Sequence, residues 1–459
     1  MKKLRFYFAL WGGKFYVFLL KLFKKEKNDR PGVAALKVCP DFLSLINKPK
    51  LVIGVTGTNG KTTTTNLIAE LLIKDNKKAI YNDWGANTKA SHARCLFDGV
   101  TIFNKVKKDV AVLEVDEKST GESTIPINFN YFIVTNLFRD SIYRNAHTEY
   151  IFNQINNYLP KKATIILNSD DPISSELNNK ESKIVYYGIE KQKIDLLESI
   201  NIIQDFRICP KCNEKITYNY LRYHHIGNYY CPKCNYKSKE STYLGTDIDL
   251  NKLTMNVLYK NKKLQYPLIS DMFYNAYNVL AIIALFNEMG MDYNKLCNYL
   301  KDLKVVKRRY STDTYNNIEI NTISTKGLNA VAVSRSFDYV ANIKGNKALI
   351  MVYDDTFDRI NGSENISWIF ETDFELLNRP DIKQIIVGGV RSLDYKVRLL
   401  QAGIPSDKII CIEDEQDTSN YIDFNNIDKI FIMHEVYYYT NSLKIKEQLI
   451  KRLNKEVQK

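Results

Sequence analysis

Short runs of apolar residues recur along the chain and alternate with segments whose apolar residues repeat at helical spacing. In the first part of the chain these runs cover residues 51–55, 110–115, 131–135 and 163–167. A continuous apolar run of this length, followed by a polar loop, is typical of a buried parallel strand. Strands that alternate with helices build doubly wound sheets, which bind ligands at the carboxyl ends of the strands. The pattern therefore predicts a parallel sheet with a binding site at that edge.

A second set of apolar runs lies towards the end of the chain. These runs cover residues 348–352, 384–389, 408–412 and 428–433, with a helical segment over 394–403. The set predicts a second, smaller α/β domain.

The length of the chain bounds its division into domains. With 459 residues it has room for about three domains of ordinary size. We expect an N-terminal segment over residues 1–30, a central domain over 31–305 and a C-terminal domain over 306–459.

A phosphate-binding motif follows the first predicted strand. Residues 52–65 read VIGVTGTNGKTTTT, which is a strand, a glycine-containing turn and the start of a helix. Backbone N–H groups of such a turn seat a phosphate, the lysine adds a mobile charge, and a threonine hydroxyl completes a Mg2+ shell. The expected nucleotide-binding residues are Gly57, Thr58, Asn59, Gly60, Lys61, Thr62 and Thr63, with Thr62 or Thr63 as the Mg2+ ligand.

The motif has one departure and one alternative interpretation. The strict pattern has a glycine where Val55 stands, so this is the shortened form GTNGKT. A glycine-rich turn without a ligand is the alternative. The lysine and threonines directly after Gly60, together with the strand before the turn, favour phosphate binding.

Two further groups are predicted at this site. Glu114 ends an apolar run with the sequence Glu114-Val115-Asp116-Glu117, and a carboxylate there is suited to bind Mg2+ or orient water. A solvated turn residue is the alternative. Asn275 and Asn278 share one face at the start of the apolar helix over 279–286. They are predicted to face the nucleotide, or else to cap the helix.

The eight cysteines predict a metal site. Four of them form two CPKC motifs with 18 residues between them: Cys209, Cys212, Cys231 and Cys234. Four thiolates fill the tetrahedral shell of Zn2+ and leave no position for chemistry, so we expect a structural zinc ribbon over about residues 205–238. Redox pairs are the disfavoured alternative. His224 and His225 lie between the motifs and are not expected to be ligands.

The charge and the remaining cysteines bear on the binding partners and on the cellular compartment. The formal charge of +13 is spread over the whole chain and no nucleic-acid-binding motif accompanies it, so a nucleic-acid partner is not expected. Four scattered cysteines do not make a disulfide framework, which favours a reducing cytoplasm.

The N-terminal stretch has two open interpretations. Residues 6–23 are apolar and aromatic, are flanked by lysines, and are interrupted at Gly12-Gly13-Lys14. The stretch falls short of the ~20 apolar residues of a spanning helix, and it lacks the cleavage site of a signal peptide. It fits a helix at the inner face of the cell membrane. It fits equally a helix docked on the protein's own body.

Together these motifs resemble the Mur ligases. The resemblance rests on GTNGKTTT after a strand, Glu114, the Asn275 and Asn278 pair, and the turn Asn-Ser-Asp-Asp-Pro at 168–172. The inserted ribbon and the distinct final domain narrow it to the MurT family, the ligase subunits of lipid II isoglutaminyl synthases. Residues 31–43 resemble the first segment of that family, so the resemblance runs from about Pro31. In the final domain it rests on Gly389, Val390, Arg391, Asp394, Arg398, Ala402 and Gly403.

The resemblance implies a fold and a reaction. The fold would be a Mur-ligase-like P-loop parallel sheet with an inserted four-cysteine zinc ribbon, plus a smaller C-terminal α/β domain. Such enzymes use ATP and Mg2+ to phosphorylate the α-carboxylate of D-glutamate in lipid II. Ammonia from a glutamine amidotransferase partner, GatD, then gives D-isoglutamine. The final domain lends the partner an aspartate. Asp358 is the favoured candidate, Asp354 is the second, and Asp355 is a further candidate.

The sequence also departs from the family pattern. The stretch 353–359 reads YDDTFDR, with an insertion before Ser367 and Trp368, where the family has Asn-Asp-x-x-Ala-Asp-Gly-x-Asp-x-Ser-Trp. Residues 143–146 and 324–329 also differ from the family's motifs. Two alternatives stay open: a Mur-type ligase that adds an amino acid to a peptide or poly-γ-glutamate without an amidotransferase, and a nucleotide-binding scaffold without activity.

Overall fold

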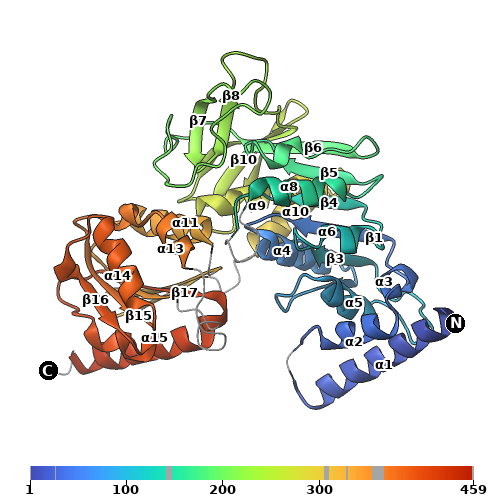
Figure 1. Ribbon diagram of the computed structural model, residues 1–459, viewed down its shortest axis with the longest axis horizontal. Coiled ribbons are helices and arrows are strands. Elements are labelled where there is room, and N and C mark those ends of the chain that lie inside the picture. Colours follow the sequence, from blue (N-terminus) through green and yellow to red (C-terminus); the bar gives the residue numbers. More distant parts are fainter. Residues whose placement is uncertain are drawn as a thin grey trace. The chain divides into compact units, whose positions relative to one another are not determined.

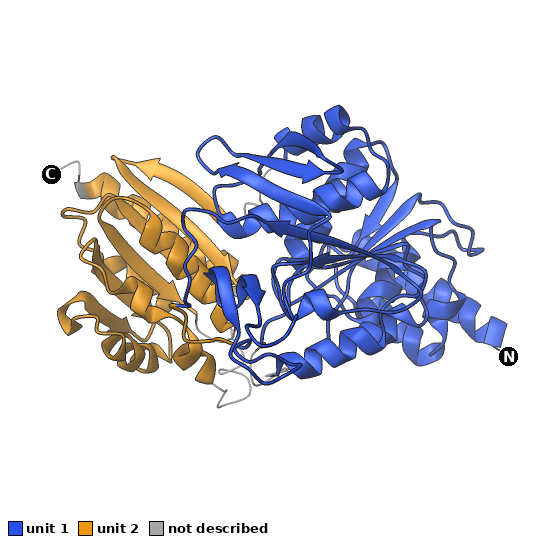
Figure 2. Ribbon diagram, turned by 90° about the horizontal axis from the view of Figure 1, so that it is seen from above, with its two compact units in different colours: residues 1–139, 147–199, 205–303 blue, residues 140–146, 200–204, 304–459 orange. Residues whose placement is uncertain are grey.

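The computed structural model divides into two compact units, each with its own sheet (Figure 1). It describes residues 2–25, 27–140, 147–303, 310–326, 329–353 and 366–456. Unit 1 comprises Met1–Arg139, His147–Ser199 and Asp205–Leu303, and unit 2 comprises Asp140–Ala146, Ile200–Gln204 and Lys304–Lys459 (Figure 2).

A nine-stranded sheet forms the centre of unit 1, in the order β11-β10-β9-β6-β5-β4-β1-β3-β2. Its strands are β1 Leu51–Thr56, β2 Ala79–Tyr81, β3 Val110–Glu114, β4 Tyr131–Val134, β5 Thr164–Asn168, β6 Lys183–Ile189, β9 Tyr243–Asp249, β10 Thr254–Tyr259 and β11 Lys262–Pro267. Strands β1 to β6 and β9 pair in parallel, whereas β10 and β11 are antiparallel. The apolar runs predicted in this half are β1, β3, β4 and β5, which confirms the parallel sheet.

Helices cover both faces of this sheet. On one face lie α4 Lys61–Lys74, α9 Phe273–Glu288 and α10 Tyr293–Lys301. On the other lie α5 Lys89–Phe97, α6 Thr120–Thr124 and α8 Thr148–Asn157. After β1 the chain forms β2 and β3, which lie on one side of β1 in the sheet. It then crosses to β4, which lies on the other side of β1. The loop after β1 therefore lies where the strand order reverses, the position at which such sheets bind ligands.

The N-terminal stretch forms helix α1, Lys2–Leu22, which packs against α2 (Arg30–Val38) and α5; the short α3, Phe42–Leu45, follows. Its buried residues are Phe6, Ala9, Leu10, Gly13 and Val17. These repeat at intervals of three or four and so form one face of the helix. Within the described residues, none of the helices has the length and apolar content needed to cross a bilayer. The helix is docked on the protein by one face.

A hairpin carries the cysteine motifs next to the sheet of unit 1. It consists of β7 Thr217–Tyr223 and β8 Ile226–Tyr230. Arg222 on β7 is buried and donates to both carboxylate oxygens of Asp195, at 2.9 and 2.7 Å, and to Asp170 at 3.3 Å. Tyr277 on α9 donates to the same Asp170 at 2.6 Å. Because breaking a buried ion pair costs about 3–5 kcal/mol, this network holds the hairpin, the sheet and α9 together.

Unit 2 is a six-stranded sheet in the order β12-β13-β17-β14-β15-β16. Its strands are β12 Tyr310–Tyr315, β13 Ile318–Thr325, β14 Lys347–Val352, β15 Ile382–Gly388, β16 Ile409–Ile412 and β17 Lys429–Glu435. All pair in parallel except β12. Helices α11 Ala330–Asn342, α13 Ser367–Glu371 and α14 Ser392–Gln401 share one apolar core, and α15 Tyr439–Glu456 covers a second. The smaller α/β domain is thereby confirmed.

Residues of the loop before the cysteine hairpin also belong to unit 2. The side chain of Asn201 donates to Asp373 at 2.8 Å, and the backbone N–H of Ile202 donates to the same carboxylate at 2.6 Å. Burial raises the pKa of Asp373. Two donors on this buried carboxylate fix the loop segment to unit 2.

Two adjacent glycines of α1 give a matched test of how this helix docks. A Cβ at Gly13 would overlap the ring of Phe97 on α5, whereas a Cβ at Gly12 would meet nothing within 4 Å. We expect Gly13→Ala to destabilise the protein by about 1–3 kcal/mol, because the ring must move out of a packed core. Gly12→Ala should be neutral or stabilise by up to ~1 kcal/mol through helix propensity. Calorimetry of the full chain measures both. Equal stability of the two variants would contradict this docking.

Candidate nucleotide site and cysteine cluster

The loop between β1 and α4 depends on two glycines. Gly57 and Gly60 have φ angles of +124° and +87°, in the region that favours glycine. A Cβ at Gly57 would overlap the hydroxyl of Thr135, and a Cβ at Gly60 would lie 2.5 Å from Oδ1 of Asn278. Both the backbone conformation and the available space therefore require glycine at these positions.

The loop after β4 holds the loop between β1 and α4, residues 57–60, which we call the phosphate loop after its predicted ligand. The N–H of Thr58 donates to the carbonyl of Asn136 at 2.8 Å, and the N–H of Asn59 donates to the Asn136 side chain at 3.0 Å. Thr135 donates in turn to the carbonyl of Asn59 at 2.6 Å. Gly60 caps α4 without any side-chain hydrogen bond. The first N–H groups of α4 have no partner within the helix, so they are the groups placed to bind an anion.

Lys61, the first residue of α4, is held inside this loop. Its side chain is buried, and its ammonium donates to Glu117 at 2.7 Å, to the carbonyl of Gly57 and to that of Thr58 at 3.4 Å. Burial opposes the charge, but the carboxylates of Glu117 and Glu114 outweigh it and raise the pKa of Lys61. The lysine is therefore a buried cation. Thr62 and Thr63 follow it, half-buried, in the first turn.

Glu114 lies at the carboxyl end of β3, and its carboxylate is buried. Its Oε1 accepts a hydrogen bond from the side chain of Asn87 at 3.2 Å. Its backbone N–H and carbonyl are both bound by the side chain of Asn82, at 2.8 and 3.1 Å. The backbone is therefore fixed on both sides.

Glu117, three residues on, makes the direct contact with Lys61. Sequence reasoning singled out Glu114 and left Glu117 as part of the same acidic run. The signal for Glu117 was its place in the loop after a strand next to the phosphate loop.

His92 on α5 forms a hydrogen bond with the backbone of Glu114. Its Nε2 lies 2.7 Å from the carbonyl oxygen of Glu114, and its Nδ1 lies 2.9 Å from the hydroxyl of Ser123. Because a carbonyl only accepts, Nε2 carries the proton and Nδ1 accepts from Ser123. Burial lowers the pKa of His92 to about 4. The neutral ring is thus part of the support of β3.

Asn275 and Asn278 lie beside the phosphate loop. The residue that caps α9 is Met272, so the interpretation of the two asparagines as caps is wrong. Both are buried, and Asn278 donates to Asn275 at 3.1 Å while its own Oδ1 faces Gly60. The structure therefore brings the asparagine pair and residues 57–63 together. Asp354, Asp355 and Asp358 lie outside the described residues.

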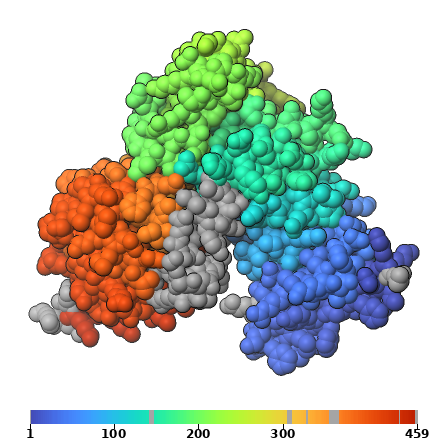
Figure 3. All heavy atoms as spheres, in the orientation of Figure 1, coloured from blue at the N-terminus to red at the C-terminus, as the bar shows by residue number. Residues whose placement is uncertain are grey.

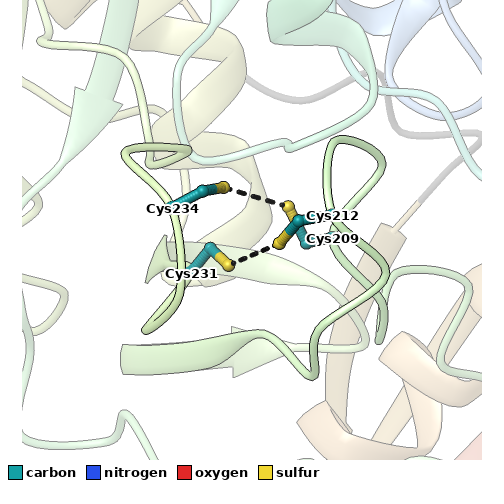
Figure 4. A group of neighbouring side chains, drawn as sticks. All are labelled: Cys209, Cys212, Cys231 and Cys234. Carbon is teal, nitrogen blue, oxygen red and sulfur yellow. Dashed lines mark hydrogen bonds between the residues drawn. The ribbon is translucent and has the colours of Figure 1, made fainter.

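The four cysteines converge in one cluster (Figure 4). Their sulfur atoms all lie within 4.8 Å of one another, with Cys209 and Cys234 at 3.6 Å and Cys212 and Cys231 at 3.4 Å. An ion with metal–sulfur bonds of about 2.3 Å separates tetrahedral sulfurs by roughly 3.8 Å, so the cluster fits a metal ion.

The two histidines between the motifs lie elsewhere. His225 stacks on Phe138 with ring centroids 4.4 Å apart, and its Nε2 is 3.4 Å from Asp171. His224 packs edge-on against the same phenylalanine. Neither belongs to the cysteine group, in agreement with the expectation that they are not ligands.

Known families match both units. The Mur ligase middle domain matches residues 55–286, and the MurT ligase C-terminal domain matches residues 328–440. A Staphylococcus aureus (strain COL) protein named lipid II isoglutaminyl synthase (glutamine-hydrolyzing) subunit MurT is 28% identical, over 87% of this chain and 89% of that protein. The Streptococcus pneumoniae (strain ATCC BAA-255 / R6) protein of the same name is 26% identical, over 92% of each.

Solved structures share the fold. A pseudomurein peptide ligase type C from Methanothermus fervidus superimposes with a TM-score of 0.66 at 22% identity, covering 90% of this chain and 81% of that one. MurF from Acinetobacter baumannii superimposes with a TM-score of 0.63 at 15% identity, covering 92% and 81%.

The chain belongs to the Mur ligase family. The matched middle domain covers the phosphate loop, the cysteine hairpin and the sheet of unit 1 except for the first residues of β1. Within the family the chain is of the MurT type, because the matched C-terminal domain and the relatives named MurT agree over both units. The resemblance read from the sequence is confirmed.

His92 gives the site a dependence on pH. The pKa of His92 in the folded protein, about 4, lies below the ordinary value of 6.5. The contribution of the neutral ring to the free energy of unfolding is therefore complete above pH 6.5 and is lost as the pH falls towards 4. The loss amounts to at most ~3 kcal/mol. We expect His92→Gln to be less stable than the wild type at pH 7.5, with a difference that shrinks by pH 4.5. Urea unfolding across this range measures it.

The exposed His147 is the matched control for this prediction. Because its side chain is exposed, His147→Gln should change the free energy of unfolding little at pH 7.5. A His92→Gln difference that does not change with pH would show that the ring does not titrate abnormally in the folded protein.

Proposed function

We propose that this chain is the ATP-dependent ligase subunit of a glutamine-hydrolysing amidating enzyme that acts on lipid II. The observation that carries the proposal is Lys61, held as a buried cation in a glycine loop at the reversal of the strand order. Support for the substrate comes from relatives named lipid II isoglutaminyl synthase (glutamine-hydrolyzing) subunit MurT.

The loop supplies phosphate positioning. The N–H groups at the start of α4 and the ammonium of Lys61 would bind the terminal phosphates of ATP. Thr62 or Thr63, with Glu114, would hold Mg2+, which screens the phosphate charge. Asn275 and Asn278 would contact the nucleotide from the side of α9. A terminal phosphate would draw Lys61 from Glu117, and the carboxylate left behind would be available to the metal ion.

The reaction that we propose, in line with the name of the relatives, has two steps. A carboxylate oxygen of the substrate D-glutamate attacks the terminal phosphorus of ATP, ADP leaves, and an acyl phosphate forms. Ammonia then attacks the acyl carbon, phosphate leaves, and the nitrogen loses a proton to give the carboxamide. The protein's part is positioning and charge stabilisation. Lys61 and the first turn of α4 would stabilise the charge on the transferred group.

The ammonia source is proposed to be a partner of GatD type, which hydrolyses glutamine. The name shared by the relatives describes one subunit of a glutamine-hydrolysing enzyme. Unit 2 would lend an aspartate to that partner, with Asp358 favoured over Asp354 and Asp355. The substrate is anchored in lipid, so we place the reaction at the inner face of the cell membrane.

The cysteine cluster is proposed to hold one structural Zn2+ ion. Four thiolates complete a tetrahedral shell, so the ion would stabilise the ribbon and would not bind substrate. The ribbon has a small apolar core of its own, formed by residues such as Ile216, Tyr229 and Tyr236. A core of this size needs a metal to keep its shape.

Amidation of lipid II tests the proposed activity. We expect the chain, with a GatD-type amidotransferase, ATP, Mg2+ and glutamine, to convert one carboxylic acid of lipid II into a carboxamide, seen by mass spectrometry. Lys61→Ala should lower the rate by at least ~100-fold, because it removes the charge that positions the phosphates. Glu117→Gln should lower it by ~10-fold or more, because the direct partner of Lys61 is lost.

Lys74→Ala is the matched control, since it removes a lysine from the other end of α4 whose ion pair with Asp302 is at the surface. It should keep the wild-type rate. ATP turnover without the mass change would leave the ligase site intact and point to another substrate or amine, such as an amino acid. Full turnover in Lys61→Ala would overturn the assignment of the loop.

Metal content tests the proposed zinc ribbon. We expect about one Zn2+ per chain by elemental analysis, as four thiolates make one site. Cys212→Ser should lower the zinc content severalfold and expose residues 205–238 to amide exchange, because the ion holds the two motifs together. Cys297→Ser, a buried cysteine outside the cluster, should keep the zinc. Absence of zinc from wild-type protein purified without chelators would contradict the assignment.

A further inference from the structure

Helix α1 carries a second apolar face on the side opposite to the one it buries. Its exposed members are Leu4, Phe8, Trp11, Phe15, Phe18 and Leu22, each between 48% and 63% accessible. They are spaced alternately by four and three residues, so they form one continuous stripe along the helix. At about 3.6 residues per turn, the buried set of Phe6, Leu10, Gly13 and Val17 lies on the other side. The stripe contributes nothing to the core of unit 1.

A neighbouring loop extends this stripe. The indole N–H of Trp11 donates to the carbonyl of Ile102 at 2.9 Å, which brings the loop over residues 101–108 against the middle of α1. Ile102 and Phe103 in this loop are 52% and 66% exposed. We call the stripe together with Ile102 and Phe103 the aromatic face. An exposed apolar surface of this size, built from two segments far apart in sequence, is typical of an interaction site.

Helix α1 and the residues that follow it directly carry charged side chains of one sign. Residues 2–25 hold seven basic side chains and no acidic one, and Glu26 is the first acidic residue of the chain. The basic residues are Lys2, Lys3, Arg5, Lys14, Lys21, Lys24 and Lys25. Beside α1, Lys107 and Lys108 of the loop line one pocket with Lys21 and Lys27. Asp98 and Asp83 line the same pocket and pair with Lys21 and Lys27 at 3.7 and 2.6 Å, so the lysines outnumber the acidic residues there. In Figure 3 the N-terminal part of the chain, in dark blue, is visible at the surface of the face shown.

We propose that the aromatic face binds an anionic phospholipid membrane, with α1 lying in the plane of the interface. Aromatic and leucine side chains bury their apolar parts between headgroups and acyl chains, while lysines pair with the phosphates. A tryptophan in the middle of the stripe has the amphipathic ring that favours this depth. The membrane is identified by charge. Residues 2–25 carry seven cations and no anion, and with Lys2 and Lys21 paired to Asp41 and Asp98 the segment keeps a net positive charge that matches a negatively charged surface.

The same charges disfavour a second copy of the chain as the occupant. A stripe spaced by three and four residues is also the pattern of a helix pair, but the helices of such pairs place opposite charges beside the seam. Two copies of α1 would instead bring cations next to cations. The inference is based on the contacts and exposure of α1. It rests on the proposed function only for the identity of the membrane, which is the inner face of the cell membrane.

Vesicle binding by the full chain tests the proposal. We expect the wild type to co-sediment with vesicles of phosphatidylglycerol and phosphatidylcholine at least ~10-fold more strongly than with phosphatidylcholine alone, and less so at high salt. The variant Phe8→Ser, Phe15→Ser, Phe18→Ser should lose binding at least ~10-fold. These three side chains are more than half exposed, so folding should be unchanged. Leucine at the same positions should restore binding.

Two further variants sharpen the test. Leu393→Ser removes an exposed leucine of α14, which is 68% accessible, and should bind like the wild type. Brominated lipid should quench the fluorescence of the wild type, and Trp11→Phe should bind equally while losing that quenching. Absence of binding, or binding that survives the triple serine change, would overturn the proposal. A dimer in solution that the triple change abolishes would also overturn it, in favour of a self-interface.

The outcome is separable from that of the proposed function. Amidation of detergent-solubilised lipid II needs no bilayer, so the triple serine variant should keep the wild-type rate in that assay. A chain that amidates but does not bind vesicles would refute only the membrane face. A chain that binds vesicles but does not amidate would refute only the reaction.

Discussion

The close fit between the phosphate loop and its two neighbours is the constraint on which the candidate site depends. Gly57 lies so near Thr135 that no side chain could be added, and Gly60 lies equally near Asn278. The loop is thus positioned by β4 on one side and by α9 on the other. Both neighbours come from parts of the chain far from the loop in sequence. The parallel sheet matters to the site because it sets these distances.

The buried charges of unit 1 follow the same principle. A buried ion is tolerated only with a partner and further hydrogen bonds, because desolvation costs several kcal/mol. Lys61 has Glu117 and two carbonyls, whereas Arg222 has two carboxylates and ring contacts with Tyr277 and Phe273. In the proposed function, a phosphate of ATP would replace the carboxylate of Glu117 as the partner of Lys61. The partners of Arg222 come from separate segments of unit 1, and the network anchors the cysteine hairpin.

Sequence reasoning reached what local patterns encode. Four strands of each sheet are continuous apolar runs, the glycine loop has fixed spacing, and the paired CPKC motifs require no knowledge of the fold. The more polar strands, such as β11 and β12, leave no such run. Sequence reasoning did not identify Glu117 as the ion-pair partner of Lys61. Glu114 and Glu117 lie in one acidic run, and only the path of the chain after β3 determines which of them contacts the lysine. It also did not foresee the role of Arg222, because Asp170, Asp195 and Tyr277 lie on separate segments. Contacts between distant segments leave no periodic signal.

Helix α1 shows why the N-terminal stretch left two interpretations open. A helix docked on a protein and a helix lying on a membrane each need one apolar face. From the sequence alone we recognised that apolar residues are abundant in this stretch, but not that they divide between two faces. Here the two requirements are met on opposite faces: one set fills the groove against α2 and α5, and the other is left exposed. The two interpretations are therefore compatible. A helix fixed to the body by Gly13 against Phe97 would hold its outer face rigidly, so little conformational entropy would be lost when that face meets a surface.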